Sequence, residues 1–232
     1  MKRFWKDAAV VREGDGWGIA LDTRPVRTPG RVPLAVQSRA LAEAIADEWR
    51  GAGETIEPRA MPLTGLANAA IDRIAPDREA FAAGLAAYGE SDLLCYRAAD
   101  PPPLVERQQA AWDPMLAWAR GRYDVHFEVV TGVMPAPQPA ATVSRLGDAI
   151  GARSAFELAA LSPLVTVTGS LVLALALLEG AASADAVWHA CRIDEDWQEE
   201  LWGEDTLATE AKEARRADFF AGVRFLELQR QP

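Results

Sequence analysis

Short hydrophobic runs separated by turn residues fill the first ~60 residues of the chain. Ala8–Arg12 and Trp17–Leu21 flank Gly14-Asp15-Gly16, and the second run places large apolar side chains at every other position. Two such runs around a glycine-aspartate turn predict a β-hairpin. Two further short runs, 26–28 and 32–36, are set off by proline and glycine. The closely spaced turns predict an antiparallel meander.

The hydrophobic spacing changes after Ser38, which can cap the N-terminus of a helix. Leu41, Ile45 and Trp49 follow at intervals of four residues, with charged side chains on the opposite face. This spacing predicts an amphipathic helix that ends at the glycines just after Trp49. We expect Trp49 to anchor the apolar stripe of this helix.

Helical spacing dominates from Pro62 to the end of the chain. Residues 123–139 are irregular and rich in proline, although 126–130 could form a short strand. The pattern predicts an α+β fold, in which a small antiparallel β-rich N-terminal domain with one helix (1–60) precedes a larger all-helical domain (61–232). The expected helices are 63–74, 77–88, 104–122 with an interruption near Pro114, 142–152, 154–161, 163–179, 183–202 and 207–229.

The segment Pro163–Leu178 carries no charge and needs to be tested as a membrane span. A spanning helix needs about 20 predominantly apolar residues. This segment is shorter, has Thr166, Thr168 and Ser170 in its first half, and lacks a basic flank. We therefore interpret it as the buried central helix of a bundle and expect no stable membrane insertion.

The net charge, the cysteines and the N-terminal segment limit the kinds of partner and the cellular compartment that we expect. The 232 residues include 24 basic and 34 acidic side chains, which give a net charge of −10. This charge argues against nucleic acid, whose binding needs a basic surface. Cys95 and Cys191 lie far apart and outside any CxxC motif, so we expect two buried thiols. The N-terminus has no secretory signal, and we expect a cytoplasmic protein.

Motifs for catalysis are missing from the sequence. It contains no GxSxG, GxxxxGK[ST], GxGxxG or HExxH pattern. The glycine-rich stretch Gly14–Gly18 lies inside the expected hairpin and opens no helix, so it cannot cradle a phosphate in the dinucleotide manner. His126 and His189 are the only histidines, and we expect them to be exposed or structurally satisfied. We therefore expect no catalytic residue, no metal ligand and no cofactor.

The densest charge in the sequence lies in Asp194–Asp205, where seven carboxylates occur within twelve residues and no Lys or Arg is present. Glu195 and Glu199 would form a like-charge i, i+4 pair on a helix. A solvated acidic face is one interpretation, and a divalent-cation site is a second. The third is a docking surface for a basic partner, which Trp197 and Trp202 favour because aromatic side chains anchor binding surfaces.

Several segments taken together resemble the ATP12 family, the assembly chaperones of the F1 sector of ATP synthase. The motifs occur in order along most of the chain: Phe4-Trp5-Lys6, Leu21–Pro29, Leu41–Trp49, Ile56–Ala67, Tyr88–Ala98, Gln108–Pro114 and Asp194–Gly203. Trp197 stands where the family often has another aromatic residue. Mitochondrial members carry a targeting extension that this sequence lacks, so the resemblance indicates a bacterial, cytoplasmic member.

The resemblance implies a non-catalytic chaperone that transiently binds the unassembled F1 α subunit and covers the surface later occupied by β. It also implies a β-rich N-terminal domain and a helical C-terminal domain. The family's functional C-terminal segment matches Glu195, Gln198, Trp202 and Gly203, and we add Glu199 from the same helix to this expected partner-binding site. Two alternatives remain: a metal-dependent enzyme that uses residues 194–205, and a scaffold with another client.

Overall fold

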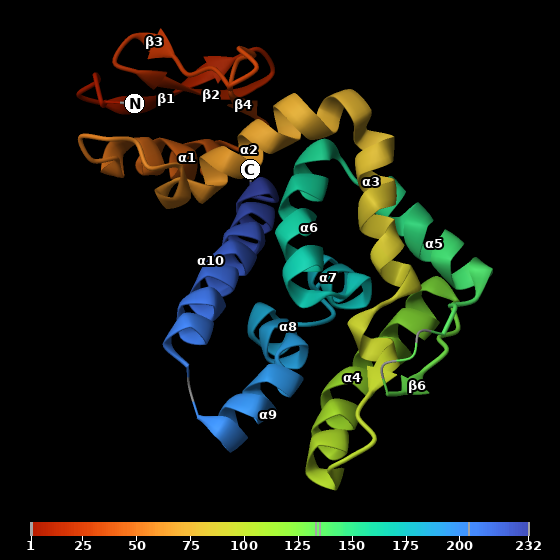
Figure 1. The fold of residues 1–232 in the computed structure, drawn as a ribbon. Coiled ribbons are helices and arrows are strands. Elements are labelled where there is room, and N and C mark those ends of the chain that lie inside the picture. The colour runs from red at the N-terminus through yellow and green to blue at the C-terminus, as the bar shows by residue number, and fades with distance from the viewer. Residues whose placement is uncertain (1, 133, 135, 204, 232) are drawn as a thin grey trace. The chain divides into compact units, whose positions relative to one another are not determined.

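The computed structural model describes residues 2–132, 134, 136–203 and 205–231. Figure 1 shows the helices and strands coloured along the sequence. The described residues group into two compact units. The first contains the residues up to 78 together with 154–160 and those from 220 onward, and the second contains 79–153 and 161–219. The strands are β1 Ala8–Glu13, β2 Gly16–Leu21, β3 Arg24–Pro25, β4 Ala35–Val36, β5 Tyr96–Arg97 and β6 Val130–Thr131. The α-helices are α1 Arg39–Gly51, α2 Pro62–Ala69, α3 Arg78–Ala86, α4 Pro102–Tyr123, α5 Ala140–Gly151, α6 Ala155–Thr168, α7 Leu171–Leu178, α8 Ala184–Cys191, α9 Ile193–Trp202 and α10 Thr206–Gln229.

The predicted hairpin is confirmed in the first unit. β1 and β2 pair antiparallel with Val10 opposite Ile19. β3 and β4 both pair antiparallel with β2, so the predicted N-terminal sheet is present. Glycine is required at position 16 because β4 approaches closely there. A Cβ at this position would lie 2.6 Å from the Val36 carbonyl oxygen.

The two later strands are shorter and displaced relative to the predicted runs 26–28 and 32–36. They comprise only Arg24–Pro25 and Ala35–Val36. The predicted runs still pair with each other, because Arg27 and Pro33 form an antiparallel bridge. The Leu34 N–H donates to the Val26 carbonyl at 3.1 Å, and the Thr28 N–H donates to the Val32 carbonyl at 2.8 Å.

Helix α1 begins and packs as predicted. The Ser38 hydroxyl accepts a hydrogen bond from the Leu41 N–H at 3.2 Å, and it donates to the Leu228 carbonyl at 2.6 Å. Leu41, Ile45 and Trp49 are buried on one face. Helix α1 ends at Gly51, so the predicted end at the glycines after Trp49 is also confirmed.

The first compact unit extends beyond the expected domain boundary between residues 60 and 61. Glu48 of α1 accepts hydrogen bonds from the Leu63 and Thr64 N–H groups at 2.7 and 2.8 Å, and another from the Thr64 hydroxyl at 2.6 Å. This carboxylate satisfies free donors at the N-terminus of α2 and therefore ties α2 to α1. The division into domains 1–60 and 61–232 remains a prediction about which parts fold independently.

The helices of the following region are present, but their breaks differ from the prediction. Residues 62–86 stay helical through Pro76, because a π-helical turn (Ala70–Ile74) and a 3-10 turn (Ala75–Asp77) replace the regular ladder where the proline lacks an N–H. Helix α4 continues past Pro114, so the predicted interruption there is wrong. Pro114 is exposed, and water can satisfy the carbonyl that it leaves without a donor.

The segment predicted as one helix over 163–179 is divided between α6 and α7. The break occurs at Gly169, which has a φ of +64°, and the Ser170 hydroxyl caps α7 by accepting from Leu173 N–H. The interior position of α7 is confirmed, since all of its residues except Leu177 are buried. Within the described residues, no helix is long and apolar enough to cross a membrane.

A small parallel sheet in the second unit was only partly predicted. β6 overlaps the end of the expected strand at 126–130, and β5 was not predicted. Tyr96 lies opposite Val130, and Arg97 lies opposite Thr131. β5 is too short to give a period-two pattern, so no sequence signal distinguished it from a loop.

Candidate functional site

Helix α9 carries the residues that the sequence indicated for partner binding. The expected helix 183–202 is interrupted at Arg192, so α8 ends at Cys191 and α9 begins at Ile193. Glu195, Gln198, Glu199 and Trp202 follow a spacing of three or four residues and therefore share one face of α9. Gly203 ends the helix with a φ of +83°, a backbone conformation that favours glycine.

Several carboxylates of α9 form ion pairs with basic side chains that lie outside the acidic segment Asp194–Asp205. The segment itself contains no Lys or Arg. The Arg192 guanidinium has only 4% of its side chain exposed and lies 2.9 Å from Asp196 and 2.8 Å from Glu199. Lys212 of α10 lies 2.6 Å from Glu199 and 3.6 Å from Asp196. The like-charge repulsion expected for this helix is therefore offset by an ion-pair network that joins α9 to α10.

Two further basic side chains reach the same helix from elsewhere in the second unit. Arg107 of α4 lies 2.7 Å from Glu200, and its guanidinium stacks over the Trp197 ring at 4.9 Å. Arg215 of α10 lies 3.7 Å from Glu195. The interpretation of this segment as a wholly solvated acidic face is corrected, because several of its carboxylates hold α9 against α4 and α10.

The ion pairs change the acidity of the groups in the network. The pKa of Glu199 lies below its ordinary value, mainly because Lys212 donates a hydrogen bond to it and further because Lys212 and Arg192 are positively charged. The pKa of Lys212 is raised, chiefly by its hydrogen bond to Glu199. Glu199 therefore contributes stability at neutral pH, and this contribution is lost as the pH falls through its folded-state pKa.

Replacing Glu199 by lysine is expected to destabilise the protein by about 1–2 kcal/mol, since it removes the acceptor of Arg192 and Lys212 and adds a third cation. Glu195→Lys is the matched control, because the exposed Glu195–Arg215 pair is expected to contribute little. Urea unfolding at pH 7 measures both variants. Equal unfolding free energies for the two variants would contradict a structural role for Glu199.

An apolar group is exposed where α9 turns into α10. Trp202 is 82% exposed, Leu207 is 75% exposed and Leu201 is 56% exposed. The Asp205 carboxylate accepts from the Leu207 and Ala208 N–H groups at 2.8 and 3.0 Å and thereby caps α10. We call Leu201, Trp202 and Leu207 the turn cluster. Leu201 and Leu207 were missed in the sequence, because helical spacing alone does not separate exposed from buried apolar positions.

The other tryptophans are more buried than Trp202. Helical spacing predicts burial of Trp49, Trp112, Trp118, Trp188 and Trp197. The first two are buried, whereas the other three are only half-buried. An exposed indole at the end of a helix fixed by ion pairs is the arrangement expected of a binding anchor.

The arrangement offers little support for catalysis. No group of three or more His, Cys, Asp or Glu side chains in the described part of the chain is placed to hold a metal ion. His126 and His189 are exposed. Cys95 is buried as expected, whereas Cys191 is only half-buried, and both thiols are free. Burial raises the pKa of each thiol to about 12, so neither is a thiolate at neutral pH.

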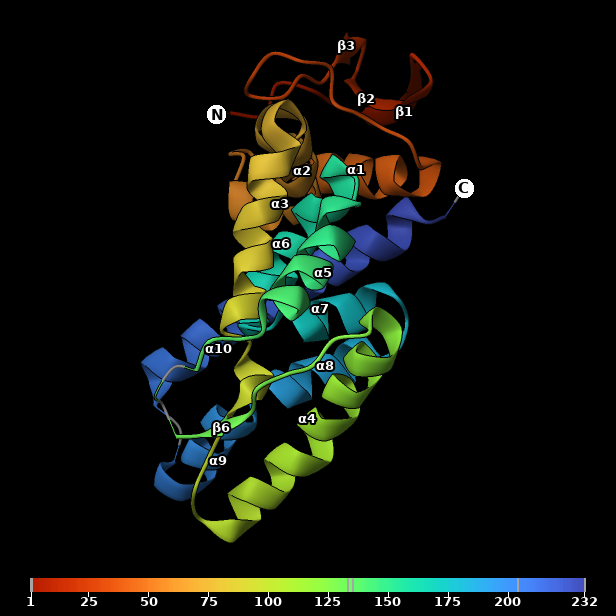
Figure 2. The same ribbon diagram turned by 90° about the vertical axis from the view of Figure 1, so that its right-hand side faces the viewer.

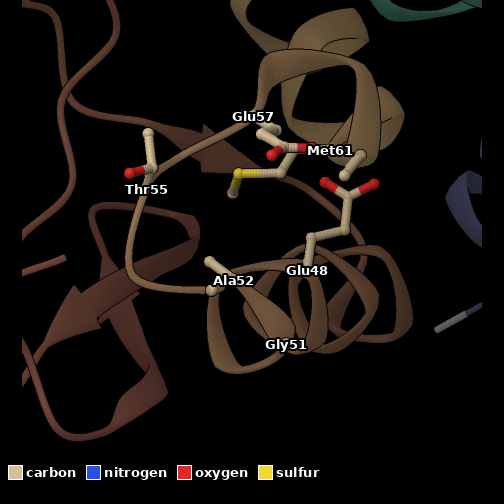
Figure 3. Close-up of a pocket in the computed structure, with 8 residues that line it drawn as sticks. Glu48, Gly51, Ala52, Thr55, Glu57 and Met61 are labelled. Atoms are coloured by element: carbon tan, nitrogen blue, oxygen red, sulfur yellow. The ribbon is translucent and has the colours of Figure 1, made fainter. Parts of the chain in front are cut away.

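A pocket of about 360 Å³ lies in the first unit between the end of α1 and the start of α2 (Figure 3). Glu48, Glu57 and Met61 are among its lining residues. Burial raises the pKa of Glu48, but both oxygens of its carboxylate already accept hydrogen bonds from the start of α2. The pocket therefore offers a structural carboxylate and no pair of groups positioned for acid–base chemistry.

Comparisons with known proteins connect the chain to chaperones. A family model described as ATP12 chaperone protein matches residues 2–120, a range that ends before α9. The crystal structure of Atp12 from Paracoccus denitrificans is 42% identical, with a TM-score of 0.93 over 99% of this chain and 98% of that chain. A point mutant of the P. denitrificans protein gives 41% identity, a TM-score of 0.93 and the same coverage. The Atu1473 protein of Agrobacterium tumefaciens is 42% identical, with a TM-score of 0.92 over 97% of this chain and 85% of that chain.

Proposed function

The chain belongs to the ATP12 family of chaperone proteins, and from this membership we propose that it is an assembly chaperone for the F1 sector of ATP synthase. It binds the unassembled α subunit transiently and covers the surface that later contacts β. An uncovered apolar subunit interface promotes aggregation, and a chaperone that shields it keeps the subunit available for assembly. The proposal assigns no reaction and no cofactor to the chain, and it places the protein in the bacterial cytoplasm.

The exposure of Trp202 is the observation that carries the choice of docking surface. An aromatic side chain that binds in a partner's pocket supplies much of the energy of an interface, and polar neighbours around it exclude water. The proposed surface comprises Glu195, Gln198, Glu199, Trp202 and Gly203, with the turn cluster as its apolar centre. Glu199 acts here by fixing α9 against α10, so the rigid helix presents Trp202 in one orientation.

Replacing both Leu201 and Trp202 by serine is expected to weaken binding of the α subunit by roughly 30-fold, the effect of losing about 2 kcal/mol at one binding anchor. Folding should be unaffected, because both side chains are exposed. The measurement is light scattering during refolding of denatured α subunit in the presence of wild-type or variant protein, with melting curves for both.

Met134→Ser is the matched control, because Met134 is an exposed apolar side chain outside the proposed surface. It should suppress aggregation as well as the wild type does. If the Leu201/Trp202 double variant also protects the α subunit fully, docking occurs elsewhere.

Added salt should slow complex formation only modestly, since many carboxylates of α9 are already neutralised by ion pairs within the chain.

A further inference from the structure

Residues 125–131 in the second unit run as an extended chain from the end of α4 into the short strand β6 (Figure 2). Consecutive residues of a strand direct their backbone N–H and C=O groups to opposite edges. Even-numbered residues direct theirs toward β5 and α5, where each described group finds a partner. At the β5 end, for example, the Gly132 N–H donates to the Arg97 carbonyl at 2.8 Å.

Two side chains take the place of a neighbouring strand on this inner edge. The buried Gln138 amide accepts from the Glu128 N–H at 3.0 Å and donates to the Glu128 carbonyl at 2.8 Å. The Thr142 hydroxyl, near the start of α5, accepts from the His126 N–H at 3.2 Å and donates to the His126 carbonyl at 2.5 Å. These contacts hold the segment straight and extended before it reaches β6.

The outer edge has no such partners. Among the residues that the structure describes, none forms a backbone or side-chain hydrogen bond with the backbone of Val129 or Thr131. Phe127 has only 3% of its surface exposed, so the open part of this edge begins at Val129. Val129 has 41% of its surface exposed, and Thr131 is also exposed. An open edge of this kind is a template for pairing with another extended chain.

A cleft of about 520 Å³ lies against the face of the same sheet. Val129 and Thr131 line it on the sheet side, and one face of α4 lines it opposite through Val105, Asp113, Ala117 and Arg120. Asp113 is paired with Arg97 at 2.8 Å, whereas no ion pair of Arg120 occurs in the described part of the chain. The cleft therefore has a mixed lining, in which Val105, Ala117 and Val129 are apolar and Arg120 is an available positive charge.

We propose that the outer edge at Val129 and Thr131 binds an extended polypeptide segment as an added strand, whose alternate side chains enter the cleft beside α4. The segment that fits has a carboxylate that reaches Arg120 and an apolar side chain that packs against Val105, Ala117 and Val129. Backbone pairing supplies affinity for many sequences, and the cleft supplies selectivity. This surface is separate from the one on α9, and the inference holds for any client that offers such a segment.

Val129→Pro tests the pairing directly, because it removes only an outward-facing N–H and adds ring atoms at the edge. The probe is a blocked ten-residue peptide of alternating valine and threonine with one central glutamate. Binding to the full chain, followed by fluorescence anisotropy, should weaken by at least about tenfold in Val129→Pro and change less than about twofold in the control Val129→Thr, which keeps the N–H.

Amide hydrogen exchange of the wild-type protein gives an independent measurement. The saturating peptide should slow exchange at Val129 and Thr131, whereas Glu128, whose N–H is already bonded to Gln138, should change little. A peptide N-methylated at alternate positions should not bind. Arg120→Gln should abolish the preference for the glutamate peptide over its glutamine analogue. Unchanged exchange at the Val129 and Thr131 amides, or equal binding by Val129→Pro and wild type, would overturn the proposal.

Discussion

Replacing Trp49 by arginine is expected to remove most of the soluble protein. Trp49 is 9% exposed and packs edge-on against Trp5 at 5.2 Å between ring centroids. The Trp5 indole N–H also donates to the Trp49 carbonyl at 3.1 Å. Truncating a buried tryptophan typically costs about 3–5 kcal/mol, and an unpaired buried charge adds to this cost. The sum is comparable with the whole stability of many domains, which is about 5–15 kcal/mol.

The measurement is the yield of soluble protein together with its melting temperature. Trp49→Phe is the matched control, because the Trp49 indole N–H is buried and has no hydrogen-bond partner among the described residues. Phenylalanine keeps the aromatic packing and removes this unsatisfied donor, so it should cost much less than arginine does. A soluble arginine variant with the wild-type melting temperature would contradict the burial of Trp49.

Replacing Asp92 should have the second largest effect on stability. Its fully buried carboxylate accepts from the Ser170 hydroxyl at 2.7 Å, the Val172 N–H at 2.9 Å and the Leu94 N–H at 3.1 Å. Alanine would leave these buried donors unsatisfied, at a cost of about 3 kcal/mol or more. Asparagine keeps the shape and part of the hydrogen bonding, so Asp92→Asn should be milder, as urea unfolding at pH 7 can establish.

Comparing the stability of the wild type and Asp92→Asn at different pH values tests the protonation of Asp92. Burial raises the pKa of Asp92 to about 6, so between its ordinary pKa and about 6 the folded protein holds a proton that the unfolded chain releases. The contribution of this proton to stability is fully present below the unfolded pKa and is lost as the pH rises through 6. Relative to Asp92→Asn, the wild type should gain up to about 3 kcal/mol of unfolding free energy between pH 7 and pH 4. A pH-independent difference would refute this assignment.

Local signals made much of the fold predictable. The hairpin and α1 follow from a glycine-aspartate turn, a Ser38 cap and a four-residue hydrophobic spacing, all of which act over a few residues. The breaks were harder to place. Pro163 was expected to separate two helices, but the chain turns at Gly169, where a positive φ and a serine cap coincide. A proline removes one hydrogen bond, whereas a left-handed residue redirects the chain.

The candidate site was predictable only in part. The sequence indicated the face of α9 and Trp202, because carboxylates and an aromatic residue are close together along the chain. It did not indicate the cations that neutralise this face. Arg107 is 93 residues from its partner Glu200, and Lys212 is 13 residues from Glu199. Partners at such distances are brought together only by the tertiary fold, so a single sequence contains no periodic signal for them.

The hydrogen bond between Ser38 and Leu228 has a consequence for synthesis on the ribosome. Its two residues are 190 positions apart, and both belong to the compact unit that also contains the N-terminal sheet. The cap of α1 therefore lacks this contact until Leu228 has left the exit tunnel. A chain made from its N-terminus must hold α1 without this contact while the residues between Ser38 and Leu228 are translated, and contacts of such long sequence separation slow folding. This chaperone thus passes through the same exposed, unassembled condition from which its family protects other proteins.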